Sequence, residues 1–372
     1  MQTLKTEQRR FFGVDLIRTL AMMMVIGIHT VLSFTLRPDF FGTKIWFVLE
    51  PLIAFSKIGI LLFFMVSGYL VIGKNRSIKE NWKITRNRIL IPLFFFSTID
   101  LLYKQYRFSL LESNLLLFWQ KQLRNISNFP DSPLWFLGVL FFIYLLNPVW
   151  QAIFTKEKES NLAVYITKLS FIFSLFVTII KFPCLRQSNF FNGFTLWLGY
   201  LPLYFYGGLV RNEWVNNNKK TISVLMIVFG LLGTIVGDYY TAYSKINSLP
   251  FVWSGYFFEY LSIPNVLLAI GVFNLLITLS NPLQNTFFKR AFVNVIRILA
   301  GLSYGIYLVH PFVINIFSDI LGFNFDKLKM NIYAYNVLNY FLVLGVSALI
   351  SYIVIKIPVL RLALGANKKS AK

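Results

Sequence analysis

The amino-acid sequence predicts an all-α, polytopic transmembrane helix bundle, and its composition is the first evidence for this fold class. Of the 372 residues, 56% are hydrophobic and only 14% are charged, whereas a soluble domain carries roughly 25% charged residues. Several apolar runs reach the length of about 20 residues with which a helix crosses a bilayer. A transmembrane β-barrel would show short segments of alternating hydrophobicity instead. We therefore expect the chain to cross the membrane repeatedly as helices.

The apolar runs predict about ten spans, in the order 14–36, 46–73, 88–103, 134–154, 162–181, 194–210, 221–240, 256–280, 291–317 and 333–358. Asp100 and Lys104 crowd the end of the third predicted span. After it comes the longest non-membrane stretch, 104–133, where LLESNLLLFWQKQLRNI has the pattern of an amphipathic helix at the membrane interface. We expect one integral-membrane domain over residues 1–372, with no appended soluble domain.

The basic residues of the connecting segments predict that both termini are cytoplasmic. With this orientation, the inner segments carry nearly twice as many Lys and Arg residues as the outer ones, which is the distribution of membrane proteins. The formal net charge of +21 is therefore a topology signal, and we expect no nucleic-acid partner. The single cysteine, Cys184, excludes an intrachain disulfide and cannot build a metal site alone.

Three polar side chains interrupt the first span: Asp15, Arg18 and His29. A helix turns about 100° per residue, so Arg18 and His29 lie on one stripe, about 16 Å apart along the axis, with Asp15 near the same face. Charged groups in lipid cost about 2.5–3.5 kcal/mol each and usually line a functional cavity. One interpretation is structural, with an Asp15–Arg18 ion pair and His29 bonded to a neighbouring helix. The other makes His29 a general base or an acyl-carrying nucleophile.

The second span contains Lys57 and, near its cytoplasmic end, Ser67-Gly68-Tyr69, and a basic loop follows it. This loop has one acid, Glu80, and six basic residues: Lys74, Arg76, Lys79, Lys83, Arg86 and Arg88. It is either an ordinary positive-inside anchor or an anion site for a phosphorylated cytoplasmic donor, since arginine forks suit phosphate oxygens.

Five blocks in order resemble the acyltransferase-3 family over about residues 12–358: DLIRTLAMMMVIGIH, IGILLFFMVSGYL, RNRILIP, SPLWFLGVLFFIYLLNP and GLSYGIYLVHP. Members of this family are integral-membrane acyltransferases that place acetyl or other short acyl groups on surface glycans. The resemblance implies the same membrane-helical fold and the same class of reaction for this chain.

The resemblance also implies site residues. His29 matches the catalytic histidine of the family and Arg18 its first-span arginine, and Asp15 is expected to orient Arg18. Donor binding is expected at Lys83, Arg86, Arg88, Ser67 and Tyr69. The family has two residues between its paired arginines, whereas this chain has one, so Lys83 is a further candidate for the role. Trp135 and His310 match later blocks and are expected to contact substrate.

The implied function is the transfer of an acetyl or other short acyl group from cytoplasmic acetyl-CoA to a hydroxyl of a cell-surface or lipid-linked glycan. The acetyl-CoA is a substrate, and we expect no metal. The implied location is the inner or plasma membrane of a bacterium, with the bilayer, acyl-CoA and a saccharide as partners. Direct transfer and an acyl-histidine intermediate both remain open. The alternative function is a transporter or flippase of polysaccharide, although the sequence has no clear inverted repeat.

Overall fold

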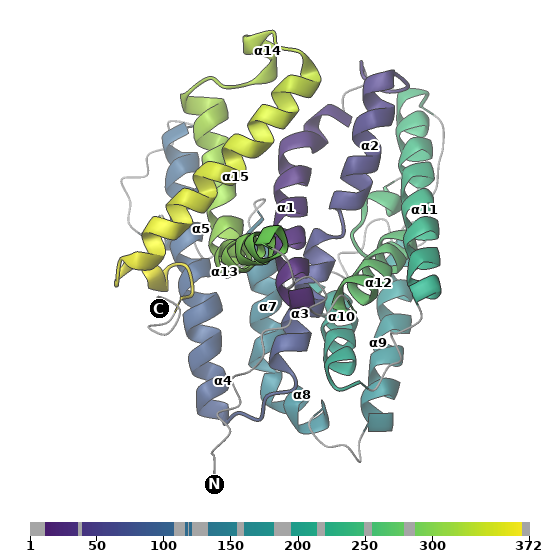
Figure 1. The fold of residues 1–372 in the computed structure, drawn as a ribbon, viewed down its shortest axis with the longest axis vertical. Coiled ribbons are helices and arrows are strands. Elements are labelled where there is room, and N and C mark those ends of the chain that lie inside the picture. Colours follow the sequence, from purple (N-terminus) through teal and green to yellow (C-terminus); the bar gives the residue numbers. More distant parts are fainter. Residues whose placement is uncertain are drawn as a thin grey trace.

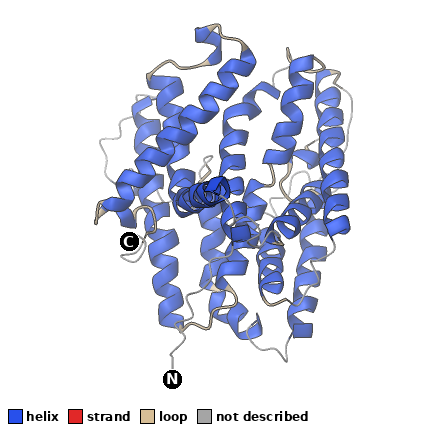
Figure 2. Cartoon of the chain, in the orientation of Figure 1, coloured by secondary structure: helices blue, strands red, loops and turns tan. Residues whose placement is uncertain are grey.

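The structure, a computed structural model, describes residues 12–35, 39–107, 116–117, 119–120, 133–154, 160–181, 195–213, 220–248, 255–278 and 287–366. These residues form helices and no strand (Figure 2), which confirms the predicted all-α class. The elements are α1 (Phe12–Thr35), α2 (Lys44–Ser56), α3 (Gly59–Val71), α4 (Ile78–Thr85), η1 (Arg86–Leu90), α5 (Ile91–Arg107), α7 (Trp135–Leu145), α8 (Asn147–Phe154), α9 (Ser160–Lys181), α10 (Leu196–Arg211), α11 (Lys220–Ile246), η3 (Tyr256–Phe258), α12 (Ile263–Ile277), α13 (Phe287–Asn315), η4 (Ile316–Ile320), α14 (Phe325–Leu328), α15 (Ile332–Lys356) and η5 (Leu360–Leu362).

The described residues include seven helices that are long and apolar enough to cross a membrane. The number is eight if α7 and α8, which meet at a 58° bend, form one broken span. The predicted spans 88–103 and 194–210 correspond to α5 and α10, which have 17 and 16 residues. The multi-pass fold is thus confirmed, whereas the count of ten and the cytoplasmic termini stay predictions. Most of the predicted interfacial helix in 104–133 lies outside the described residues.

Helix α1 lies at the centre of the bundle and packs against α2, α3, α12, α13 and α15 (Figure 1). Its apolar side chains are buried, with Ile17, Met22 and Ile26 fully inaccessible. A side chain on Gly59 of α3 would stand 2.8 Å from the carbonyl oxygen of Ala21, so glycine permits the two backbones to approach here. The polar stripe of α1 is therefore enclosed by neighbouring helices.

The predicted second span, 46–73, contains a local break. Helix α2 ends at Ser56 and α3 begins at Gly59, with Lys57 and Ile58 between them. The Gly68 position in α3 packs directly on the carbonyl oxygen of Tyr204, and Gly207 of α10 packs on the carbonyl oxygen of Met65. Gly68 therefore serves close helix packing.

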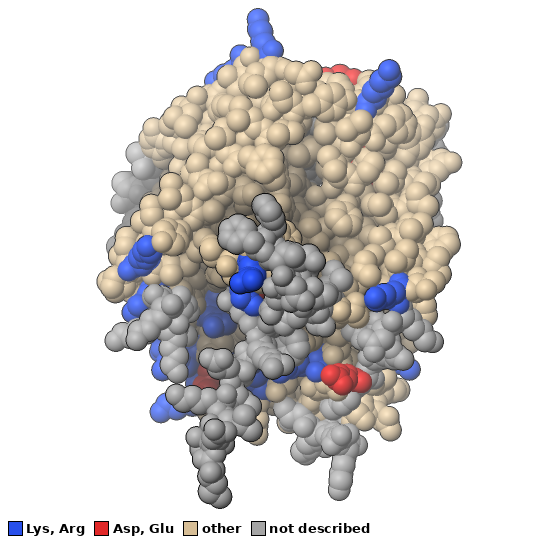
Figure 3. Space-filling model, viewed as in Figure 1, with Lys and Arg blue, Asp and Glu red and all other residues tan. Residues whose placement is uncertain are grey.

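Buried amides hold the basic helix α4 against its neighbours. The Asn81 side chain donates to Gln151 at 2.9 Å and accepts from Asn147 at 3.2 Å, and the Tyr204 hydroxyl donates to Asn147 at 2.8 Å. Such a network is rigid because each buried polar group has a partner. Figure 3 shows that Lys and Arg on this face gather mostly toward the end of the molecule that carries α4 and α8.

Candidate active site

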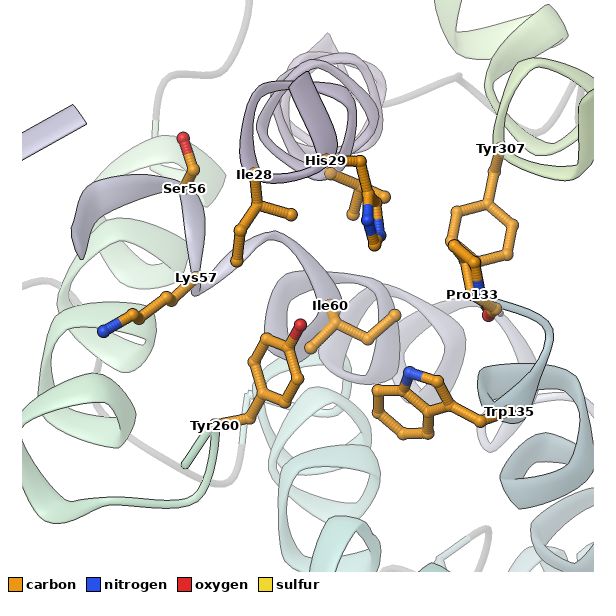
Figure 4. A pocket seen from close by; sticks show the side chains of 10 residues that line it. Ile28, His29, Ser56, Lys57, Ile60, Pro133, Trp135, Tyr260 and Tyr307 are labelled. Carbon is orange, nitrogen blue, oxygen red and sulfur yellow. Dashed lines mark hydrogen bonds between the residues drawn. The ribbon is translucent and has the colours of Figure 1, made fainter. Parts of the chain in front are cut away.

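The side chain of His29 faces a cavity between α1 and the neighbouring segments. The cavity is narrow, with an accessible volume of about 10 Å³, and is partly open to the surroundings. Its lining residues are Val25, Ile28, His29, Ser56, Lys57, Ile60, Pro133, Trp135, Tyr260 and Tyr307. The His29 imidazole points from α1 into this space (Figure 4), and its side chain is accessible although α1 is central. An imidazole that faces a cavity can exchange a proton with a bound molecule.

The second histidine of the chain lies beside the first. The ring centroids of His29 and His310 are 5.3 Å apart, at an interplanar angle of 39°. His310 is fully buried on α13, and its Nδ1 lies 2.6 Å from the carbonyl oxygen of Tyr307. The structure therefore places His310 next to the candidate catalytic group, 281 residues further along the chain.

An aromatic wall closes the other side of the cavity. The Trp135 ring packs against Tyr260 and Tyr200, with centroid distances of 5.8 and 5.3 Å, and the Tyr260 hydroxyl points toward the interior (Figure 4). The Tyr307 hydroxyl donates to the carbonyl of Pro133, which fixes the start of α7. Aromatic faces and phenol hydroxyls are groups to which a sugar binds by stacking and hydrogen bonding. Trp135, a predicted substrate contact, thus lies in the cavity.

Lys57 lines the cavity through its stem, but its ammonium group points away from it (Figure 4). The ammonium pairs with Asp238 of α11, donates to the carbonyl of Phe257 at 3.5 Å, and lies 4.5 Å from the centroid of the Phe258 ring. Glu50 of α2 hydrogen-bonds to the same Asp238 carboxyl. Lys57 and Asp238 are 2% and 0% exposed. A buried charge without a partner is strongly unfavourable, so each of the two side chains supplies the counter-charge that the other needs. The break between α2 and α3 is therefore anchored to α11.

A cationic cluster lies at the other end of the polar stripe of α1. We use this name for Arg18, Lys74, Arg76, Arg88 and Arg211, which come from α1, the loop before α4, η1 and α10. Arg18, Arg76 and Arg88 all act electrostatically on the Tyr144 hydroxyl. Burial lowers the pKa of Lys74, and repulsion from Arg76, Arg88 and Arg211 lowers it further. Cations held this close to one another attract a multiply charged anion.

One acid that acts on this cluster, Glu80, is already engaged in hydrogen bonds. Glu80 acts on Arg76 electrostatically, but its carboxylate accepts hydrogen bonds from the Ser77 backbone N–H at 3.0 Å and the Ser77 hydroxyl at 3.1 Å. These bonds, together with Arg76, lower the pKa of Glu80. The bond from the Ser77 N–H and the reciprocal bond from the Glu80 N–H to the Ser77 hydroxyl, at 3.3 Å, form a capping box at the start of α4. Glu80 therefore serves the helix terminus first.

The structure brings only some of the predicted donor-binding residues together. Arg88 belongs to the cationic cluster, and the Ser67 side chain hydrogen-bonds to Tyr144 at its edge. Tyr69 also borders the cluster, because the Arg211 guanidinium lies 5.4 Å from its ring centroid. Lys83 and Arg86 are exposed, and the Arg86 Nε donates to Asn87 at 3.0 Å.

Asp15 and Arg18 both lie within the bundle, Asp15 buried and Arg18 half-buried. The Thr19 hydroxyl donates to the Asp15 carbonyl at 3.0 Å. Sequence reasoning placed Lys74 and Arg76 only in the basic loop and did not single out Arg211. Their convergence depends on the contact of α10 with α3, which no local pattern reveals.

The helical bundle, the histidine-lined cavity and the cationic cluster define an integral-membrane acyltransferase once they are compared with known families. The model of a family described as "Acyltransferase domain" matches residues 11–356. The chain belongs to the acyltransferase-3 family, which confirms the resemblance and favours acyl transfer over transport. The searches of curated proteins and of solved structures returned no match.

Proposed function

We propose that the protein transfers an acetyl or other short acyl group from cytoplasmic acyl-CoA to a hydroxyl of a cell-surface or lipid-linked glycan. The observation that carries this proposal is the arrangement along α1, with the cationic cluster near Arg18 and the cavity at His29. The separation along the helix axis is about 16 Å. The family assignment supports the reaction class, and the arrangement supports the choice of donor and acceptor.

The donor is proposed to bind with its phosphates in the cationic cluster. Guanidinium groups bind phosphate oxygens through paired, charge-assisted hydrogen bonds, and Arg76 and Arg88 lie together near Tyr144. Lys83 and Arg86, exposed near the same end of the bundle, are the outer contacts of the nucleotide. The pantetheine arm then extends along α1 and brings the thioester to His29.

The acceptor is proposed to enter the cavity from the side of Trp135 and Tyr260, whose ring faces suit a sugar. Its hydroxyl oxygen attacks the thioester carbonyl carbon while His29 takes the hydroxyl proton. The carbon–sulfur bond breaks, an ester bond forms, and His29 returns the proton to the departing CoA thiolate. Asp15 is assigned to orienting Arg18, whereas His310, which is fully buried beside His29 and outside the cavity lining, is not assigned a contact with the acceptor.

The location proposed for this multi-pass protein is the plasma membrane of a bacterium, where cytoplasmic acyl-CoA and a surface glycan face opposite sides. The test compares the acyl content of surface polysaccharide purified from the parent strain, the deletion strain and the complemented deletion strain. We expect the deletion to remove one acyl mass per repeat unit. Unchanged acylation, or unexported polysaccharide with normal acylation, contradicts the proposal.

A second measurement separates direct transfer from an acyl-enzyme. The purified protein is mixed with acyl-labelled acyl-CoA and denatured before acceptor is added. Label that stays on the protein and is lost in His29→Ala indicates an acyl-histidine. Absence of label with full transfer activity indicates that the hydroxyl attacks the thioester directly.

A further inference from the structure

The hydrogen bonding of His310 fixes which of its nitrogens carries a proton. Nδ1 lies 2.6 Å from the carbonyl oxygen of Tyr307, and a carbonyl oxygen only accepts hydrogen bonds. Nδ1 must therefore be the donor. In the neutral imidazole, the other nitrogen, Nε2, then has a free lone pair.

The sequence explains why the Tyr307 carbonyl is open to this bond. In a helix, the carbonyl of residue i accepts from the N–H of residue i+4, and the residue four positions after Tyr307 is Pro311. Proline has no N–H, so its presence inside α13 leaves the Tyr307 carbonyl without its helical donor. His310 supplies the missing hydrogen bond from its side chain. The segment YLVHP thus sets the tautomer of its own histidine.

The free nitrogen of His310 is shielded from solvent, in a ring that lies beside that of His29. His310 is 0% exposed, and Nε2 has no hydrogen-bond partner among the described residues. Its ring is 5.3 Å from that of His29, centroid to centroid. An unpaired lone pair in such a position is costly to bury, and the His29 imidazole is the polar group beside it.

We propose that His310 is a positioning residue for His29, which it orients and whose tautomer it sets through a hydrogen bond from His29 to His310 Nε2. This inference rests on the proposed function, in which His29 is the base. A chain of bonds then runs from the Tyr307 carbonyl through His310 to His29, and it leaves the second nitrogen of His29 bare and facing the cavity. The hydrogen bond between His29 and His310 forms fully after a small rotation of the His29 ring on binding of the acceptor, because catalytic hydrogen bonds often tighten only in the complex.

The proton balance of the step is simple. The acceptor hydroxyl gives its proton to the bare nitrogen of His29 as its oxygen attacks the thioester carbonyl. The resulting imidazolium donates a hydrogen bond to His310 Nε2, which spreads its positive charge over both rings. The proton then leaves from His29 to the CoA thiolate, and both histidines return to their starting tautomers.

The tautomer is measured directly by NMR of the full-length protein labelled with ¹⁵N-histidine and purified through a tag without histidine. The chain has only two histidines, so His29→Ala assigns the remaining signals to His310. We expect a protonated Nδ1 and an unprotonated Nε2 for His310. A protonated Nε2 overturns the inference. In Pro311→Ala, the new N–H competes for the Tyr307 carbonyl, and we expect the second tautomer to appear.

Two substitutions of His310 separate positioning from packing. His310→Asn keeps a donor for the Tyr307 carbonyl but lacks an acceptor at the position of Nε2, and we expect kcat to fall about 10²-fold with KM for acyl-CoA unchanged. His310→Gln places an amide oxygen near the position of Nε2, and we expect it to restore about tenfold of the loss. Wild-type kcat in His310→Asn overturns the inference.

The two proposals fail in different ways. If His29→Ala abolishes transfer while His310→Asn is fully active, the proposed function stands and the role of His310 is wrong. If His29→Ala retains transfer, the proposed base is wrong whatever the tautomer of His310. Pro311→Ala is the check on folding, because a helix gains a backbone hydrogen bond in this variant, so lower kcat with retained thermal stability supports positioning.

Discussion

Replacing Arg76 tests the proposed donor site most specifically. Arg76 belongs to the cationic cluster and acts on the same Tyr144 hydroxyl as Arg88 and Arg18. A hydrogen bond to a charged group contributes about 1.5–3 kcal/mol, and each 1.4 kcal/mol is about tenfold in affinity. Arg76→Ala also removes repulsion that lowers the pKa of Lys74. Lys74 is then more fully charged, which offsets part of the lost affinity for the donor. We expect KM for acetyl-CoA to rise about tenfold.

The assay compares two donors that carry the same thioester. Acetyl-CoA has phosphates, whereas acetyl-pantetheine has none, so a phosphate-binding arginine affects only the first. We expect Arg76→Ala to raise KM for acetyl-CoA and to leave KM for acetyl-pantetheine unchanged, with kcat retained for both. Lys79→Ala is the matched control, because Lys79 is an exposed basic residue of α4 outside the cluster. Equal changes for both donors, or none for either, would refute the assignment of the phosphates to this cluster.

Three further predictions concern the scaffold and the charge of the cluster. Asp238→Asn leaves Lys57 buried without its counter-charge, and we expect the free energy of unfolding in a denaturation series to fall by about 3–5 kcal/mol. The double variant with Lys57→Met and Asp238→Leu should recover most of that loss. Equal stability of Asp238→Asn and the wild type contradicts this prediction. The pKa of Lys74 is lowered by burial and by the neighbouring arginines, so a larger fraction of its amine is neutral near pH 8 than in an ordinary lysine. Lys74 should therefore react with an amine-acylating reagent faster than an ordinary lysine, and acetyl-CoA should protect it; mass spectrometry that finds ordinary reactivity and no protection counts against both the lowered pKa and the donor site. Gly68→Ala places a methyl group against the carbonyl of Tyr204 and should lower the free energy of unfolding by about 1–3 kcal/mol. An unaltered melting curve would show that α3 and α10 do not pack this closely.

Much of the fold could be predicted because hydropathy in a membrane protein is a strong local signal. The apolar runs locate nearly all of the long helices, and the placement of His29 and Arg18 on one stripe follows from the helical period alone. The predicted bounds of the spans at α5 and α10 differ from the observed helix ends by one to four residues. The break at Lys57 was not predicted, and the ion pair of Lys57 with Asp238 on the distant α11 is a contact that no local pattern reveals.

Within the candidate site, the sequence predicted the relative positions only of residues that belong to one helix. His310 was expected to contact substrate, but its place beside His29 depends on the packing of α1 on α13. One local signal was present, since a histidine directly before Pro311 lies next to a freed carbonyl three residues back. The roles of Arg76 and Arg211 had no such signal. Basic residues in a cytoplasmic loop look alike in sequence, and only tertiary contacts separate the cluster from Lys83 and Arg86.

The most direct test of the account is the acylation of surface polysaccharide in cells whose only copy of the gene carries His29→Ala. The variant protein is first shown to be inserted in the membrane at the wild-type level. We predict that the polysaccharide then carries no acyl groups from this enzyme, as in the deletion strain, because the cavity has lost its base. Acylation at the wild-type level in these cells would contradict the central claim that His29 performs the proton transfer.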